Sequence, residues 1–475
     1  MASRAIGRVI FLYLVSVELV STQNYTVPDV TIHALKPKGI RVYIPDSPGV
    51  SLFVFQGNVN KDIANQDVGL ITGEITNPTN GLWLFENLDV QLKVGDVVNY
   101  YVFVVSDKKG YMKDSMTFTV KVLEDPSSIP SGGGDCAPTQ TLVRNGQACA
   151  GKIIFEETFD LLREDVWQIE QYVPDEPDYP FVSYQRPFNA QTVSVQGGNL
   201  RIEPKLQQNI PGFSNSSIEM GILDLFSGCT ATSTKCRTEA WGASILPPIV
   251  SGRLTSKTFA FTYGVVEIRA KLPQGDWLYP DILLQSFLKK YGIPNYSSGV
   301  VRIAGARGNG QLTDRNFDIG NKMLYGGLLM NAKCRDVLQG SRASSRPWAD
   351  EFHLYAVRWT PDEITLSVDG EEWARFAPTG EGLRDSFSNS CDVPRSVLAT
   401  GSKLAPFDDH FVITLGVAAG GITEFPDDVT SGGKLKPWKN TSRKASLLFW
   451  QDMASWIETW RQPALLIDYV TVRAL

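Results

Sequence analysis

Residues 264–272 read GVVEIRAKL, and from Val266 to Leu272 apolar and charged side chains alternate strictly. This alternation is typical of a β-strand with one buried face. Asp369-Gly370 predicts a tight hairpin turn after another such strand. Because no regular helical pattern separates the strands, residues 151–475 are predicted to form one large β-sandwich. Further strand patterns occur at residues 352–359, 364–368, 411–417 and 466–473. For residues 447–460, a short helix and an aromatic-rich loop both stay open.

A second set of strand patterns occupies residues 23–125, which contain no cysteine. About seven short strands in a segment of this length are typical of an immunoglobulin-like β-sandwich. The Pro-, Ser- and Gly-rich composition that follows predicts a linker at 126–150. The chain is therefore predicted to be all-β. The clearest strands of the first segment are predicted at 51–55, 99–105 and 117–122, with turn signals between them.

The composition argues against several classes of partner. The formal charge is only −6 over 475 residues, and the absence of a long basic run argues against nucleic acid. Three histidines and no CxxC pair argue against a metal site, and no cofactor is expected. Eleven tryptophans could offer faces to sugar rings, although most large aromatic side chains belong to cores.

The N-terminus has the pattern of a secretory signal peptide. Arg4 and Arg8 precede an apolar run from Val9 to Val20, and a suitable cleavage region follows at 21–23. The run is short for a membrane-spanning helix, and no other run is long enough to cross a bilayer. A signal peptide is therefore predicted at 1–22, and the mature protein is expected to be secreted, with no transmembrane segment.

Sequons and cysteines agree with export. N-glycosylation is predicted at four sequons, which begin at Asn24, Asn215, Asn295 and Asn440. An even number of cysteines in a secreted chain favours disulfides. Pairing of neighbours closes the shortest loops, although other connectivities stay open. The candidate pairs are Cys136 with Cys149, Cys229 with Cys236, and Cys334 with Cys391.

The first domain carries a family resemblance in the stretches PKGIRVYIPDSPGVSLFVFQGNVN, GLWLFENLDVQLKVGDVVNYYVFV and KKGYMKDSMTFTV. They resemble the N-terminal β-1,3-glucan-binding module of insect glucan-recognition and Gram-negative-bacteria-binding proteins, carbohydrate-binding module family 39. The resemblance implies a flat glucan-binding face, for which Asp46 and Trp83 are the candidates. A turn-stabilising role for Asp46 and a core position for Trp83 are the alternatives. The family usually has tryptophan where Ile71 and Val102 stand, which implies fewer stacking aromatics here.

The second domain carries its own resemblance, in GKIIFEETFD, YGVVEIRAKLPQGDWLYPDILL, FHLYAVRWTPDEITLSVDG, FVITLGVAAGG and FWQDMASWIETW. These stretches are similar to glycoside hydrolase family 16, the β-1,3-glucanases with a jelly-roll (concanavalin-like) β-sandwich. The resemblance implies that fold for 151–475. It also implies a cleft in which Trp277 and Tyr279 could stack on sugar, with core packing as the alternative.

In that family a single strand supplies three carboxylates, in the pattern Glu, any residue, Asp, two residues, Glu, followed shortly by Arg-Gly-Asn. Residues 299–309 read GVVRIAGARGN, in which Arg307-Gly308-Asn309 sets the register. The nucleophile, the middle carboxylate and the acid/base are then replaced by Val300, Arg302 and Gly305. The family geometry includes a bulge that turns the third position to the cleft face.

Without these carboxylates no hydrolysis is expected, because a retaining glycosidase needs a matched pair of acids. The nearest acids in the sequence, Asp281, Asp314 and Asp318, do not recreate the spacing. Arg302 is expected to be neutralised by a carboxylate such as Asp318, or else to present a cation to an acidic glycan or partner. His353, on an alternating strand, is expected to be structural.

The resemblance as a whole implies a secreted innate-immune recognition protein. Such a protein would bind microbial polysaccharide (β-1,3-glucan, lipopolysaccharide or peptidoglycan) without hydrolysis and would activate a serine-protease cascade. A secreted β-1,3-glucanase, and a protein-interaction adaptor that has lost sugar binding, are the alternatives.

Overall fold

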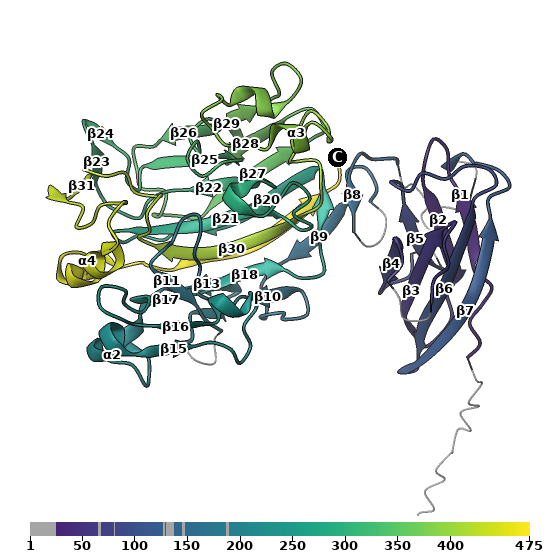
Figure 1. Cartoon of the computed structure of the whole chain (residues 1–475), viewed down its shortest axis with the longest axis horizontal. Coiled ribbons are helices and arrows are strands. Elements are labelled where there is room, and N and C mark those ends of the chain that lie inside the picture. The colour runs from purple at the N-terminus through teal and green to yellow at the C-terminus, as the bar shows by residue number, and fades with distance from the viewer. Residues whose placement is uncertain are drawn as a thin grey trace, which may run out of the picture. The chain divides into compact units, whose positions relative to one another are not determined.

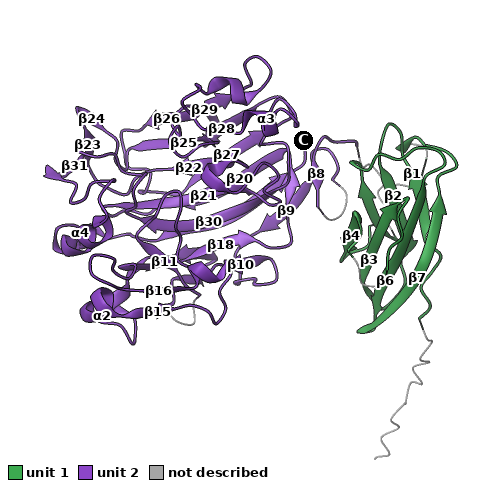
Figure 2. Cartoon of the chain, in the orientation of Figure 1, with its two compact units in different colours: residues 1–132 green, residues 133–475 purple. Residues whose placement is uncertain are grey.

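The computed structural model describes residues 25–475, except 65–67, 80, 127–128, 130–136, 145–147 and 187–189 (Figure 1). The chain forms two compact units, residues 1–132 and 133–475, which Figure 2 colours separately. The division falls inside the segment 126–150 that composition predicts as a linker. The predicted signal peptide at 1–22 lies outside the described residues. In the part of the chain that the structure describes, no helix is long and apolar enough to cross a membrane.

Unit 1 is a sandwich of two antiparallel sheets, which confirms the predicted immunoglobulin-like fold. One sheet has the order β1-β2-β5, formed by Thr31–Ala34, Ile40–Pro45 and Leu82–Asn87. The other has the order β4-β3-β6-β7, formed by Ile71–Ile75, Val50–Val59, Val97–Ser106 and Lys109–Thr119. Alternate side chains of both sheets meet in one apolar core, which includes Phe53, Phe55, Trp83, Phe85 and Tyr100.

Unit 2 is built on two larger sheets. The first, here called the β22 sheet, has the order β10-β18-β30-β21-β22-β25-β26, with β19 paired to β30 and β8 paired to β19. Figure 1 shows β22, β21 and β30 as neighbouring strands. Its strands are β8 Leu142–Val143, β10 Trp167–Ile169, β18 Arg253–Ser256, β19 Phe261–Thr262, β21 Leu278–Ser286, β22 Val300–Gly305, β25 Met323–Leu329, β26 Gln339–Ala343 and β30 Phe411–Ala419.

The second, here called the β33 sheet, has the order β12-β13-β33-β20-β27-β28-β29, with β9 beside β33. The predicted strand at 264–272 is its strand β20, and Asp369-Gly370 forms the predicted turn, with φ values of 52° and 81°. Its strands are β9 Ile153–Glu157, β12 Val193–Gln196, β13 Asn199–Ile202, β20 Gly264–Lys271, β27 His353–Trp359, β28 Ile364–Val368, β29 Glu371–Phe376 and β33 Leu465–Arg473.

The core of unit 2 lies between these two sheets. Val266 and Ile268 of β20 belong to the same buried cluster as Ile282 of β21 and Val301 of β22. Each strand therefore points alternate side chains into the core and the others outward, toward loops or solvent. The arrangement confirms the predicted jelly-roll sandwich.

Smaller elements border the two sheets. Residues 447–460, for which the sequence left helix and loop open, are mostly helical. Helices α4 and α5 bury Phe449 and Trp456, and the two rings stack with their centroids 4.6 Å apart. The helices are α2 Asn215–Met220, α3 Arg395–Leu398, α4 Ala445–Gln451 and α5 Met453–Trp456, with 3₁₀ turns η2 Gln207–Asn209, η3 Ser233–Lys235, η4 Pro294–Tyr296, η5 Leu383–Ser386 and η6 Ile457–Thr459. The short strands are β11 Val182–Tyr184, β14 Lys205–Leu206, β15 Ile222–Asp224, β16 Arg237–Glu239, β17 Ile249–Ser251, β23 Leu312–Asp314, β24 Phe317–Asp318, β31 Thr430–Ser431 and β32 Lys434–Leu435.

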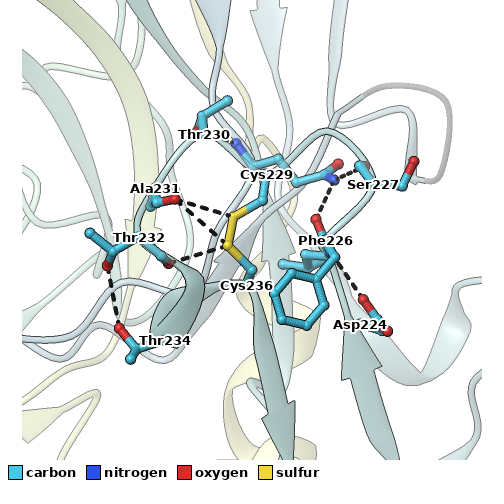
Figure 3. Close-up of a disulfide and its surroundings, with 11 residues drawn as sticks. Asp224, Phe226, Ser227, Cys229, Thr230, Ala231, Thr232, Thr234 and Cys236 are labelled. Atoms are coloured by element: carbon cyan, nitrogen blue, oxygen red, sulfur yellow. Dashed lines mark hydrogen bonds between the residues drawn. A yellow bond between two sulfur atoms is a disulfide. The ribbon is translucent and has the colours of Figure 1, made fainter.

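Two of the predicted disulfides are present. Cys229–Cys236 closes the connection between β15 and β16, as Figure 3 shows, and Cys334–Cys391 joins the loop after β25 to the segment before α3. Cys149 is also disulfide-bonded, while Cys136, its predicted partner, lies outside the described residues.

The predicted glycosylation sites differ in their surroundings. Asn215 and Asn295 are exposed, whereas Asn440 is half-buried. The Asn440 side-chain amide donates to the carbonyl of Phe425 (2.9 Å) and accepts from Lys436 Nζ (2.7 Å). Asn24 lies outside the described residues. Glycosylation itself stays a prediction at all four.

Removing the two disulfides should have unequal effects on stability. The Cys334–Cys391 bridge spans 57 residues, and the Cys229–Cys236 bridge spans 7. Loop-closure entropy then predicts a loss of about 4 kcal/mol for Cys334→Ala/Cys391→Ala and about 2 kcal/mol for Cys229→Ala/Cys236→Ala. Denaturant unfolding of the two double variants beside wild type measures both losses. An equal effect would contradict the entropic explanation.

Candidate functional site

The outer face of β22, turned away from the core, carries the positions that the sequence singles out. Val301 and Ile303 belong to the main core, whereas Val300 packs with Leu283 and Leu329 in a separate small cluster. Strand alternation therefore places Val300 and Arg302 on the outer face. The register with β25 shifts between Arg302 and Gly305, so the implied bulge is present although no carboxylate follows it.

Gly305 lies directly against the side chain of Tyr325. A Cβ placed on it would lie 3.1 Å from Cε2 and Cζ of Tyr325, closer than most Cβ contacts in proteins. Tyr325 stands opposite Gly305 on β25 and is itself buried. A side chain at position 305 would therefore need the Tyr325 ring to move by a few tenths of an ångström.

Arg302 is buried, with only 5% of its surface exposed, and it is neutralised by Glu424. Its Nη2 lies 3.1 Å from Glu424 Oε2, and Nη2 of Arg307 lies 3.3 Å from Oε1 of the same carboxylate. Both guanidinium groups also lie over the Tyr325 ring, 5.1 and 4.8 Å from its centroid. One carboxylate and one aromatic ring therefore hold two arginines in place.

A carboxylate neutralises Arg302, as predicted, but that carboxylate belongs to Glu424 and not to Asp318. Asp318 instead accepts hydrogen bonds from the backbone N–H groups of Leu312 (3.1 Å) and Gly320 (3.0 Å). Glu424 lies in the loop after β30, far from Arg302 in the sequence, and the two come close because β30 and β22 both pair with β21. No spacing in the sequence signals that contact.

A third arginine completes the cluster. Arg335, in the loop after β25, pairs with Asp178 (Nη1 to Oδ1, 2.9 Å), and its Nη2 lies 3.8 Å from Glu424 Oε2. Asp178 also accepts hydrogen bonds from the hydroxyls of Thr423 (2.6 Å) and Tyr296. Three guanidinium groups and two carboxylates leave a net charge of +1. We call Arg302, Arg307, Arg335, Asp178 and Glu424 the arginine cluster.

Both carboxylates of the arginine cluster are held in the ionised form. Burial by itself would raise the pKa of Glu424, but the three neighbouring guanidinium groups outweigh it and hold the pKa below its usual value. The pKa of Asp178 is also lowered, because Arg335 and the Thr423 hydroxyl overcome the opposing effect of burial. Neither group is therefore a proton donor near neutral pH.

Asp281, on neighbouring β21, belongs to a separate ion network. Its carboxylate pairs with Arg253 Nη1, and Nε of Arg253 lies 3.0 Å from Glu170 Oε2. Burial raises the pKa of Asp281, against the effect of Arg253. Gln285 accepts from Arg253 Nη2 (3.0 Å) and from the Thr414 hydroxyl (2.9 Å). The acid on the strand next to β22 is thus engaged in a structural network.

The two predicted stacking residues of the cleft, Trp277 and Tyr279, are core residues. They are 2% and 5% exposed, so neither presents a ring face to a sugar. Trp277 packs edge to face against Phe425 and Trp438, with centroids 5.2 and 5.0 Å apart. The segment after β30 covers both rings, which corrects the stacking assignment.

In unit 1 the structure likewise favours the structural alternatives. Trp83 is 1% exposed and belongs to the core, and its Nε1 donates to Asp46 Oδ1 (2.7 Å). Trp83 therefore does not lie on a ligand face, while Asp46 is exposed and fixes the indole. Ile71 and Val102 are also buried, so an aromatic residue at either position of this fold would face the core.

The Arg-Gly-Asn motif at 307–309 has a packing role. Asn309 is fully buried; its Oδ1 accepts from the backbone N–H of Trp277 (3.1 Å) and its Nδ2 donates to Ser431 Oγ (2.9 Å). A Cβ on Gly308 would lie 2.4 Å from the carbonyl oxygen of Gly275, so only glycine fits there. His353, the first residue of β27, pairs with Asp369 (2.7 Å) in the turn after β28, in agreement with a structural role.

Comparisons with known proteins agree with this architecture. Residues 26–136 match the CBM39 family model, described as "Carbohydrate binding domain (family 32)". The chain is 59% identical to a β-1,3-glucan-binding protein of Hyphantria cunea, over 98% of each chain. It is 36% identical to β-1,3-glucan-binding protein 1 of Manduca sexta (98% of this chain, 99% of that one). It is 34% identical to Gram-negative bacteria-binding protein 1 of Drosophila melanogaster (95% and 96%).

The two sandwiches, with a carbohydrate-binding family match over the first, define a modular protein of the carbohydrate-recognition class. The relatives match 95–98% of the chain at these identities, which extends well beyond one module. The chain belongs to the family of insect β-1,3-glucan-binding and Gram-negative bacteria-binding proteins.

Replacing Glu424 by glutamine should destabilise unit 2. The substitution leaves the guanidinium groups buried without their shared counter-charge, at a cost of about 3–5 kcal/mol near neutral pH. Because the folded-state pKa of Glu424 is lowered, its contribution is present above the unfolded-state value of 4.5 and is lost as the pH falls below it. The difference between wild type and Glu424→Gln in urea unfolding should therefore shrink in acid.

Glu371→Gln is the matched control. Glu371 pairs with Arg342 on the surface, where its side chain is 70% exposed, and a pair of this kind contributes about 0–1 kcal/mol. Equal losses in Glu424→Gln and Glu371→Gln would show that the arginine cluster does not depend on Glu424.

Proposed function

We propose that this protein is a secreted recognition protein that binds β-1,3-glucan or related microbial surface polysaccharide and does not hydrolyse it. The observation that carries the proposal is the arginine cluster, which lies on the outer face of β22 where the related glucanases would hold their catalytic acids. The names of its relatives, β-1,3-glucan-binding and Gram-negative bacteria-binding proteins, support the binding half.

The absence of hydrolysis follows from what each position can do chemically. Retaining cleavage needs a nucleophilic carboxylate and a protonated acid roughly 5–5.5 Å apart. Val300 offers a methyl surface inside an apolar cluster, and Gly305 has no side chain and lies against the Tyr325 ring. Glu424 and Asp178 are ionised and bound to arginines, so neither donates a proton or attacks an anomeric carbon.

Glucan binding is assigned to unit 1, on the strength of its match to the carbohydrate-binding model over residues 26–136. Asp46 remains a candidate because it is exposed, whereas the buried Trp83 supports the fold beneath it. Activation of a serine-protease cascade after binding completes the proposed role. Loss of sugar binding, leaving a protein-interaction adaptor, is the outcome that a binding experiment separates from this role.

The full chain should be retained on insoluble β-1,3-glucan. Trp83→Phe preserves an aromatic core residue and should bind glucan within about twofold of wild type, since the ring does not face the ligand. Trp83→Ala removes a fully buried ring and should destabilise unit 1 by about 3–5 kcal/mol. A sedimentation assay with soluble laminarin as competitor measures binding, and thermal unfolding of both variants measures stability.

Failure of wild type to sediment would favour the adaptor instead. A stable Trp83→Phe protein that loses glucan binding would return Trp83 to the ligand face. The same assay with lipopolysaccharide, lipoteichoic acid and peptidoglycan ranks the candidate ligands.

Purified protein should release no reducing sugar from laminarin above the level of a buffer blank. The expected rate is lower than that of a matched glucanase by several orders of magnitude, because both carboxylates of the retaining mechanism are missing. Turnover that co-elutes with the protein through successive purification steps would overturn this conclusion.

A further inference from the structure

A pocket of about 340 Å³ lies on unit 2, and its floor belongs to the β33 sheet. Arg201 of β13, Leu466 of β33 and Lys271 of β20 stand in one row across three adjacent strands. Their sequence neighbours Leu200, Ile467 and Ala270 point into the core, so the row faces outward. This is the opposite side of the sandwich from the arginine cluster, which lies outside the β22 sheet.

The rim of this pocket is fixed by the segment that leads into β33. Gln274 N–H donates to the carbonyl of Gln462 (2.7 Å), and Trp460 Nε1 donates to the carbonyl of Asp276 (3.0 Å). A Cβ on Gly275 would lie 2.5 Å from Trp460 Cδ1, so glycine lets the backbone approach the ring closely. The Trp460 side chain is therefore a positioned wall of the pocket.

The pocket is strongly cationic. Three cations line it, and the one carboxylate, Glu203, pairs with Arg201 (3.0 Å), leaving a net charge of +2. Among the described residues, Lys271 and Arg461 form no ion pair or side-chain hydrogen bond. They differ in this from the arginine cluster, where each guanidinium faces a carboxylate. Lys271 and Arg461 are thus available to an anion from outside.

We propose that this pocket binds a sugar residue that carries an anionic group, a carboxylate or a phosphate. Leu466 and Pro463 give an apolar floor and Trp460 an aromatic wall, which suit the C–H face of a pyranose ring. Lys271 and Arg461 supply charge-assisted hydrogen bonds to the anion. The volume is at the lower end of the roughly 300–1,000 Å³ typical of ligand sites. A neutral β-1,3-glucan has no group for these cations, so this site goes beyond the proposed function.

The test uses the full chain and three soluble probes: trigalacturonate for a carboxylate, glucose 6-phosphate for a phosphate, and laminaritriose as the neutral control. Calorimetric titration should show binding of at least one anionic probe, weakened as salt is raised. Lys271→Ala/Arg461→Ala should weaken that binding at least about tenfold, because it removes both unpaired cations. The probe that binds identifies the anion.

Lys152→Ala/Arg315→Ala is the matched control, since it removes one exposed lysine and one exposed arginine that do not line the pocket. It should bind the anionic probe as wild type does. Retention of the Lys271→Ala/Arg461→Ala protein on insoluble β-1,3-glucan should be unchanged, which separates this site from unit 1. The proposal fails if wild type binds neither anionic probe, if Lys271→Ala/Arg461→Ala weakens laminaritriose binding as much as anion binding, or if both double variants lose anion binding to the same extent.

Discussion

Glu424 is a single buried carboxylate that faces three guanidinium groups, and the outer surface of the β22 sheet is organised around it. Arg302 comes from β22, Arg335 from the loop after β25, and Glu424 from the segment after β30. In a site of low dielectric constant an unpaired charge is costly, so each of these segments is held where its charge is compensated. The ion pairs of Glu424 therefore hold the loops after β25 and β30 in place, and they also neutralise the buried charge of Arg302 on β22.

The same segment after β30 explains why the aromatic side chains near β22 are unavailable to a ligand. Phe425 directly follows Glu424, and Phe425 and Trp438 pack on Trp277. Asn309 forms hydrogen bonds with the backbone N–H of Trp277 and with the hydroxyl of Ser431, which also follows β30. The Arg-Gly-Asn motif thus holds the loops together, although the strand before it carries no acidic residue. Loop packing is therefore a physical reason for the motif that does not require catalysis.

Much of the fold could be predicted because it rests on local patterns. Alternation marked β20 and β28, a continuous apolar run marked β30, the Asp-Gly turn was recognisable, and the disulfides Cys229–Cys236 and Cys334–Cys391 followed from pairing of neighbours. The assignments of aromatic side chains to ligand faces did not hold. Trp83, Trp277 and Tyr279 are aromatic residues on strands, and the sequence gives no sign of whether a ring at such a position faces the core or a sugar.

The sequence by itself determined the two all-β sandwiches and the replacement of the implied carboxylates by Val300, Arg302 and Gly305, since these depend on residue identity and local periodicity. Only the tertiary structure decided what those replacements touch: Leu283 beside Val300, Glu424 beside Arg302, and the Tyr325 ring beside Gly305. It also decided the position of the cationic pocket, where Arg201 of β13, Leu466 of β33 and Lys271 of β20 lie beside Trp460. Strand pairing brings together residues far apart in the chain, and no spacing along the sequence encodes which strands become neighbours.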